Sequence, residues 1–129
     1  MSRDQHTRPT RVMIVEDHTD FRELMKVLLG SQPDIELLAQ AGSLAEARDQ
    51  VARFELDVAV LDLGLPDGSG ADLIADLRRA NNHVRILVLS ASLDPVGIEK
   101  ARSSGADVIL DKLTPVEEVL ATVRRLGNT

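Results

Sequence analysis

Cysteine is absent from this 129-residue sequence, which excludes both a disulfide framework and a metal site built on thiolates. No apolar run approaches the length of a transmembrane helix, and the first ten residues lack the apolar core of a secretory signal. A chain with these absences fits the reducing cytosol. We therefore expect a cytoplasmic protein that does not engage a membrane.

The sequence has fewer basic than acidic residues. The chain has 21 acidic and 15 basic residues, a formal net charge of -6, and basic residues that are scattered rather than clustered. This balance predicts no direct contact of the domain with nucleic acid. Apolar residues make up 43% of the chain, enough for one continuous core at this length. We expect a flexible N-terminal tail over residues 1–10, one domain over residues 11–127, and no second domain in the sequence as given.

Short runs rich in Val, Ile and Leu alternate with longer segments of helical period. This pattern is typical of a parallel sheet with helices on both faces, because central strands covered on both sides are apolar throughout. We predict an α/β fold with a flavodoxin-like, doubly wound, five-stranded parallel sheet in the order 2-1-3-4-5 and five helices. The predicted strands are Val12–Val15, Ile35–Gln40, Val58–Leu61, Val84–Leu89 and Asp107–Leu110, and the predicted helices are Asp20–Leu29, Leu44–Phe54, Gly70–Ala80, Pro95–Ser103 and Pro115–Leu126.

Several helix starts carry capping chemistry. Ser43–Glu46 and Thr114–Glu117 both match the capping box, in which a hydroxyl and a carboxylate satisfy backbone N–H groups reciprocally. Pro95 and Pro115 suit a first helical position, with Asp94 and Thr114 as the preceding caps.

Other local signals concern helix ends, a loop and the core. Gly30, Gly105 and Gly127 suit helix C-terminal positions of positive φ, and Leu65–Gly70 predicts a loop. Helical spacing predicts that the following apolar residues face the core: Leu24, Val27, Leu28, Val96, Ile98, Ala101, Val116, Val119, Leu120 and Val123.

Five polar residues follow or end the predicted strands. In an open parallel sheet, ligands bind outside the carboxyl ends of the strands, where the strand order reverses. Glu16 and Asp17 end the first strand, Asp62 the third, Ser90 the fourth and Lys112 the fifth. Because the first and third strands would be neighbours about 4.8 Å apart, Asp17 and Asp62 are expected to lie close together. Such crowding of carboxylates requires a cation.

The residue types indicate phosphoryl chemistry. Three acids supply hard oxygen ligands that suit Mg2+ better than a transition metal. The Asp62 carboxylate is a competent nucleophile toward phosphorus, and the Lys112 ammonium is placed to stabilise charge on the transferred group. A hydroxyl at Ser90 could bond the new phosphoryl oxygen and draw in the loop after it, which is switch chemistry rather than enzymatic turnover.

Four segments resemble the signature segments of response-regulator receiver domains of bacterial two-component systems. They are Val12–Asp17, Asp57–Gly68, Ile86–Ala91 and Gly105–Lys112, within a resemblance that spans about residues 11 to 126. The acid pair Glu16–Asp17, Asp62, Ser90 and Lys112 end four different strands in this order, and the order is far more specific than any single motif.

The resemblance implies a phosphoacceptor role for Asp62, with a sensor histidine kinase or phosphotransfer protein as donor. It also implies that Asp17, Asp62 and the backbone carbonyl of Gly64 bind Mg2+ (or Mn2+), with Glu16 contributing through water. Output is expected through the face of the fourth helix, fifth strand and fifth helix, toward a downstream protein or a second copy of the chain.

The sequence departs from the family pattern in its switch residues. Ile109 stands where an aromatic side chain usually couples to Ser90, and the only aromatics, Phe21 and Phe54, lie in predicted helices. Leu113 replaces the proline that normally follows the lysine, as in receivers attached to helix-turn-helix output domains.

Four functions remain open. The first is a single-domain phosphorylation switch, and the second is the regulatory half of a helix-turn-helix transcription factor. The third is a phosphohydrolase, which Gly64 disfavours because that position usually carries a general acid. The fourth is a docking domain that acts without phosphorylation, suggested by Ile109. The histidines His6, His18 and His83 show no metal-binding spacing, and His18 is expected at most at the rim of the site.

Overall fold

The structure is a computed structural model that describes residues 8–80, 82–91 and 94–128. Its main sheet has five parallel strands in the order β2-β1-β3-β6-β7, which confirms the predicted 2-1-3-4-5 arrangement. A small antiparallel hairpin, β4–β5, stands apart from it. The elements are β1 (Thr10–Val15), α2 (Thr19–Gly30), β2 (Ile35–Ala41), α3 (Leu44–Arg53), β3 (Val58–Leu61), β4 (Gly64–Leu65), β5 (Gly68–Ser69), α4 (Gly70–Arg79), β6 (Arg85–Ser90), α5 (Pro95–Ser104), β7 (Val108–Asp111) and α6 (Val116–Gly127).

The predicted N-terminal tail falls largely outside the described residues. Strand β1 begins at Thr10, whose N–H donates to the carbonyl of Asp34 at 2.9 Å. The ordered sheet thus starts one residue ahead of the expected domain boundary.

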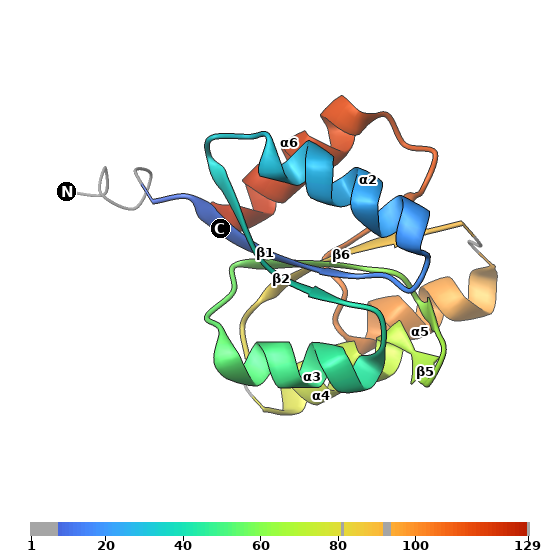
Figure 1. Ribbon diagram of the computed structural model, residues 1–129. Coiled ribbons are helices and arrows are strands. Elements are labelled where there is room, and N and C mark those ends of the chain that lie inside the picture. Colours follow the sequence, from blue (N-terminus) through green and yellow to red (C-terminus); the bar gives the residue numbers. More distant parts are fainter. Residues whose placement is uncertain (1–7, 81, 92–93, 129) are drawn as a thin grey trace.

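Helices cover both faces of the sheet. Figure 1 shows α2 and α6 on one face and α3, α4 and α5 on the other. The central strand β3 is apolar throughout, and all four of its residues are buried. Two apolar cores result, one on each side of the sheet, as predicted for strands covered on both faces.

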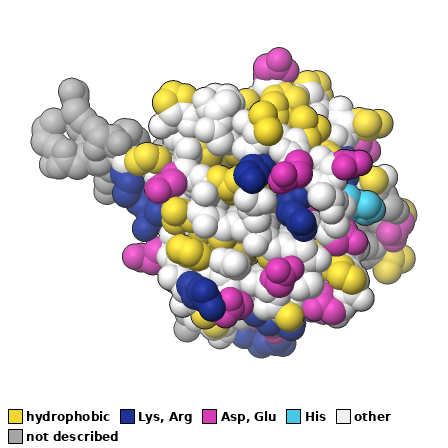
Figure 2. All heavy atoms as spheres, in the orientation of Figure 1, with side chains coloured by type: hydrophobic (Ala, Val, Ile, Leu, Met, Phe, Trp, Pro, Cys, Tyr) yellow, Lys and Arg dark blue, Asp and Glu magenta, His cyan; other side chains and the backbone are white. Residues whose placement is uncertain are grey.

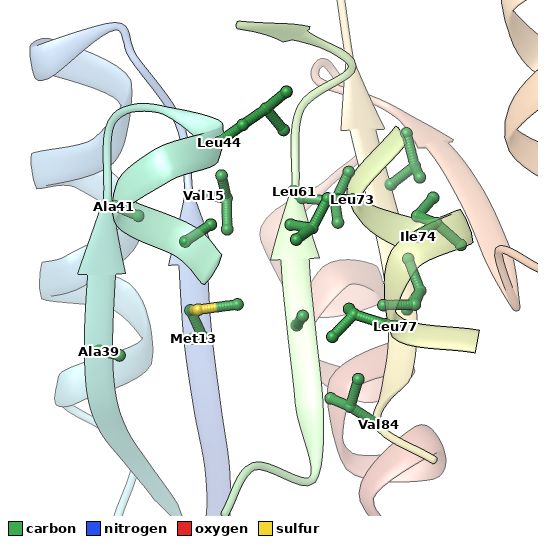
Figure 3. Close-up of a cluster of buried hydrophobic side chains, with 14 of the residues drawn as sticks. Met13, Val15, Ala39, Ala41, Leu44, Leu61, Leu73, Ile74, Leu77 and Val84 are labelled. Carbon is green, nitrogen blue, oxygen red and sulfur yellow. The ribbon is translucent and has the colours of Figure 1, made fainter. Parts of the chain in front are cut away.

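The core beneath α3 and α4 is drawn in Figure 3. Side chains of β1 and β3, such as Met13 and Leu61, lie toward those of α4, such as Leu73 and Ile74. These residues are essentially inaccessible to solvent. Their burial fixes the strands rigidly, and so fixes the polar residues that follow the strand ends.

Two of the three predicted caps form. The Ser43 side chain accepts a hydrogen bond from the Glu46 N–H, and the Asp94 side chain accepts one from the Gly97 N–H. The prediction of a capping box at Thr114 is wrong. Helix α6 begins at Val116 with Pro115 in the cap position, and no side chain caps it. Pro115 has extended backbone geometry, so Thr114 lies one residue too far from the helix.

Four residues predicted for the core are exposed, among them Val116, which begins α6 and is 39% exposed. Leu24 and Val27 are 51% and 67% exposed, because α2 buries its Met25 and Leu29 stripe instead. Val96 is also exposed, since it lies in the first turn of α5, ahead of the part that packs on the sheet.

The predicted positive φ occurs at one of the three helix-end glycines. Gly105 is the C-cap of α5 with φ of 116°. Gly30 and Gly127 are instead the last residues of α2 and α6, and neither has a positive φ.

Acidic and basic side chains are interspersed over the face in Figure 2, without a continuous basic area. Within the described part of the chain, no helix combines the length and apolar character that crossing a bilayer requires.

Candidate functional site

The predicted polar residues meet at one end of the sheet. Glu16 and Asp17 directly follow β1, Asp62 follows β3, Ser90 is the last residue of β6 and Lys112 follows β7. Backbone hydrogen bonds extend the sheet ladder to these residues, such as that from the Asp62 N–H to the Val15 carbonyl at 3.0 Å. The carboxyl ends of parallel strands therefore bring together residues that are far apart in the sequence.

Lys112 bridges two of the acids. Its Nζ lies 2.7 Å from Oε1 of Glu16 and 3.1 Å from Oδ2 of Asp62. Glu16 and Asp62 are only 3% and 6% exposed, so the ammonium compensates charges that water hardly reaches. Burial alone would lower the pKa of Lys112, but the hydrogen bonds to Glu16 and Asp62 raise it above its usual value. Lys112 is therefore a fixed cation in the site at neutral pH.

Phe21 supports this lysine. Its ring, in the first turn of α2, lies with its centroid 4.6 Å from Lys112 Nζ, within the range of a cation–π contact. The sequence predicts that Phe21 lies in a helix, but it does not predict the contact of its ring with Lys112. A strand end and a helix start that are about 90 residues apart carry no shared sequence signal.

His18 also adjoins the acids. Its Nδ1 lies 2.9 Å from Oε2 of Glu16, and its backbone N–H donates to the same oxygen at 3.1 Å. The hydrogen bond to Glu16, followed by the charge of Asp17, raises the pKa of His18. The ring is 69% exposed, which fits the expected rim position. Its side-chain hydrogen bond to Glu16 was not predicted from the sequence.

The donor set fits a divalent cation. Ligand atoms of Glu16, Asp17, His18 and Asp62 all lie within 4.8 Å of one another. Oδ1 of Asp17 is buried, and among the described residues it accepts no hydrogen bond. A buried carboxylate oxygen without a donor is costly, and a bound cation is the natural partner for it. Carboxylate oxygens are the ligands that Mg2+ prefers.

The hairpin β4–β5 borders this cluster and was predicted only as a loop. Gly64 pairs with Ser69 across it, two residues beyond Asp62. Between its strands, the Asp67 carboxylate accepts hydrogen bonds from the N–H groups of Leu44 at 2.8 Å and Ala45 at 3.1 Å. Asp67 thus caps the N-terminus of α3 from a segment 22 residues away, and ties the hairpin to that helix.

Replacing Asp67 with alanine is expected to lower the melting temperature of the protein at neutral pH. The hydrogen bond from the Leu44 N–H, the largest influence, lowers the pKa of Asp67. Its stabilisation is therefore complete above the ordinary carboxyl pKa and is lost as the pH falls through the lowered one. Thermal unfolding of wild type and Asp67→Ala should differ at about pH 7 and converge as the pH falls below the lowered pKa of Asp67.

The matched control for that experiment is Asp49→Ala, which removes an exposed acid paired only with Arg53 along α3. Its melting temperature should stay close to wild type. A difference between Asp67→Ala and wild type that grows on acidification would contradict the assigned role.

The remaining predicted switch residues lie on neighbouring strands. Ser90 is buried, and its backbone carbonyl accepts a hydrogen bond from the Lys112 N–H at 3.1 Å. Ile109, on β7, is partly buried against the core beneath α3 and α4. The two residues belong to the paired strands β6 and β7.

Comparisons with known proteins agree with this geometry. The family model described as the response regulator receiver domain matches residues 12–124. The DNA-binding transcriptional activator DevR/DosR of Mycobacterium tuberculosis is 34% identical over 117 residues, covering 91% of this chain and 54% of the relative. The nitrate/nitrite response regulator NarP of Escherichia coli is 35% identical over 116 residues, covering 90% and 54%. The chain thus spans about half the length of the curated relatives it matches.

A solved structure shows the same fold. The signal receiver domain of a response regulator named NarL from Mycobacterium tuberculosis superposes with a TM-score of 0.88 at 28% identity, covering 93% of this chain and 97% of that one.

Proposed function

The chain belongs to the response regulator receiver domain family, and from this premise we propose that it is a phosphorylation switch whose phosphoacceptor is Asp62. The observation that carries the proposal is the pairing of a buried Asp62 with Lys112 beside two further acids. A buried ion pair is a costly way to stabilise a fold, and it is better explained by chemistry.

Asp62 is the nucleophile in this proposal. Its Oδ1 accepts a hydrogen bond from the Leu63 N–H at 2.8 Å, and its Oδ2 accepts one from Lys112. The two contacts hold the carboxylate in one orientation at the carboxyl-terminal edge of the sheet. A carboxylate oxygen attacks phosphorus, the P–O bond of an acyl phosphate forms, and the bond to the donor breaks.

Asp17, Asp62 and the carbonyl of Gly64 would hold Mg2+ (or Mn2+), with Glu16 contributing through water. The bound ion supplies charge neutralisation for the crowded carboxylates and the incoming phosphoryl group. Asp67 supports this set because it anchors the hairpin that carries Gly64.

Lys112 and Ser90 act on the transferred group. The ammonium leaves Asp62 Oδ2 for an oxygen of the phosphoryl group, whose charge it stabilises. The Ser90 hydroxyl donates to another phosphoryl oxygen, and that bond would draw in the loop after Ser90, of which residues 92 and 93 lie outside the described part of the chain. These residues assist the phosphorylation and the later dephosphorylation of Asp62 itself, so the protein is a phosphoacceptor rather than an enzyme with a substrate of its own.

The output surface is formed by α5, β7 and α6. Ile109 lies on β7, and without an aromatic ring there the change at Ser90 propagates through aliphatic packing. The partner that binds this output surface is a downstream protein or a second copy of the chain. Nucleic acid would be contacted by a separate domain, and we place the protein in the cytoplasm with a sensor histidine kinase or phosphotransfer protein as donor.

Whether this domain works alone is the second point of the proposal. We favour a single-domain regulator over residues 11–127. The alternative, the regulatory half of a helix-turn-helix transcription factor, is supported by relatives about twice as long as this chain and by the DNA-binding role of one of them, DevR/DosR. Docking without phosphorylation is the other alternative.

The test is intact mass after incubation with Mg2+ and acetyl phosphate. Wild type is expected to gain one phosphoryl group, and Asp62→Asn none. If neither protein gains mass although Mg2+ binds, the phosphoacceptor role fails and docking without phosphorylation replaces it.

A further inference from the structure

We propose that His18 makes the acid cluster a mixed nitrogen–oxygen site, which takes a borderline transition-metal ion such as Co2+, Ni2+ or Zn2+ as well as Mg2+. The inference rests on the cation site of the proposed function and adds a ligand to it. It concerns which ions the site selects.

The first support is the position of the ring nitrogen. His18 Nδ1 lies 2.9 Å from Oε2 of Glu16 and 3.4 Å from Oδ1 of Asp17. Adjacent ligands about 2.1 Å from an octahedral ion lie about 3.0 Å apart. The ring nitrogen and Asp17 Oδ1 therefore already have nearly the spacing of two adjacent ligands, with Glu16 beside them to contribute through water.

The second support is the unsatisfied oxygen of Asp17. Oδ1 is buried and accepts no hydrogen bond from the described residues, although His18 Nδ1 lies only 3.4 Å away. The ring nitrogen and this oxygen face one shared space without bonding to each other. An ion between them would satisfy the Asp17 oxygen, and the ring nitrogen would exchange its hydrogen bond to Glu16 Oε2 for a bond to the ion.

The local backbone holds His18 in place. It is the N-cap of α2 with extended geometry, and its N–H bonds to Glu16 Oε2. The carbonyl of Glu16 accepts a hydrogen bond from Arg22 at 2.7 Å, so the turn between β1 and α2 is fixed from both ends. Although its ring is largely exposed, His18 starts from a defined position beside the acids.

The chemistry of the ligands determines which ions respond. Imidazole nitrogen suits Co2+, Ni2+, Cu2+ and Zn2+, whereas Mg2+ takes oxygen ligands and keeps several waters. His18 should therefore strengthen binding of the borderline ions and leave Mg2+ to the carboxylates. Mg2+ serves as an internal control at the same site.

The experiment uses tag-free protein with His6 and His83, the other two histidines of the chain, replaced by alanine. In that background, Co2+ binding is followed by its visible absorption, and Mg2+ binding by displacement of Co2+ and by calorimetry. His18→Ala is expected to weaken Co2+ binding at least about tenfold and to change Mg2+ binding by less than about twofold. Asp17→Asn should weaken both ions.

The outcomes separate the two proposals. Equal Co2+ affinity with and without His18, at retained Mg2+ binding, overturns the inference and leaves the proposed function intact. Equal weakening of both ions by His18→Ala assigns His18 a structural role and also overturns the inference. Failure of the parent protein to bind either ion removes the cation site itself, and with it the basis of both.

Discussion

Replacing Lys112 with alanine is expected to slow phosphorylation of Asp62 by about 10²- to 10³-fold, the effect of removing one fixed group that stabilises transition-state charge. The ammonium lies 3.1 Å from Asp62 Oδ2 and is held by Glu16 and by the Phe21 ring. The measurement is the initial rate of phosphoryl incorporation from acetyl phosphate, followed by intact mass.

Lys100→Ala is the matched control, because Lys100 is exposed and pairs only loosely, at 3.6 Å, with the exposed Asp72. Its phosphorylation rate should equal that of wild type. A Lys112→Ala protein that is folded and phosphorylated at the wild-type rate would refute the role assigned to the ammonium.

Replacing Gly70 with alanine should destabilise the fold by about 1–3 kcal/mol, the usual cost of overpacking a tight site. A Cβ at this first residue of α4 would lie 2.4 Å from the Asp62 carbonyl oxygen and 3.2 Å from the Leu63 Cα. Both neighbours are backbone atoms, so relief requires moving the segment that carries Asp62, the proposed phosphoacceptor. Chemical denaturation measures the stability, and the phosphorylation rate should fall with it.

Gly30→Ala provides the comparison, since a Cβ there would meet nothing within 4 Å and the residue ends α2. It should be neutral or stabilise by up to about 1 kcal/mol. If the two alanine variants proved equally stable, the close approach of α4 to the Asp62 backbone would not limit the side chain at position 70, contrary to the structure.

The sheet and the positions of its chemical residues were predictable because both depend on short-range patterns. Apolar runs such as Val58–Leu61 mark strands buried on both faces, and the polar residue after each run marks its carboxyl end. The fold then brings those ends together. The convergence of Glu16, Asp62 and Lys112 follows from topology alone.

The details that sequence missed depend on tertiary contacts. Asp67 caps α3 across 22 residues, and Phe21 lies against Lys112, so neither partner is visible from local spacing. Leu24 has the periodicity of a core residue, yet it lies beside the buried stripe of α2 rather than on it. The helical period locates the buried face of a helix only to within about one residue. That precision is too low to separate core residues from residues at the edge of the buried stripe.

His18 shows the same limit in the site. From sequence it is a histidine without metal-binding spacing, since its possible partners are the adjacent acids and Asp62 further along the chain. Only the turn before α2 reveals that its ring nitrogen faces Glu16 and Asp17.

The most direct test of the central claim is to locate the modification. Wild-type protein phosphorylated in Mg2+ is treated with borohydride, which reduces an acyl phosphate to the corresponding alcohol, and the digested peptides are sequenced by mass spectrometry. We predict homoserine in place of Asp62, and unmodified aspartate at position 17. Reduction at any other acid, or at none despite a measured phosphoryl gain, would contradict the assignment of Asp62 as the phosphoacceptor.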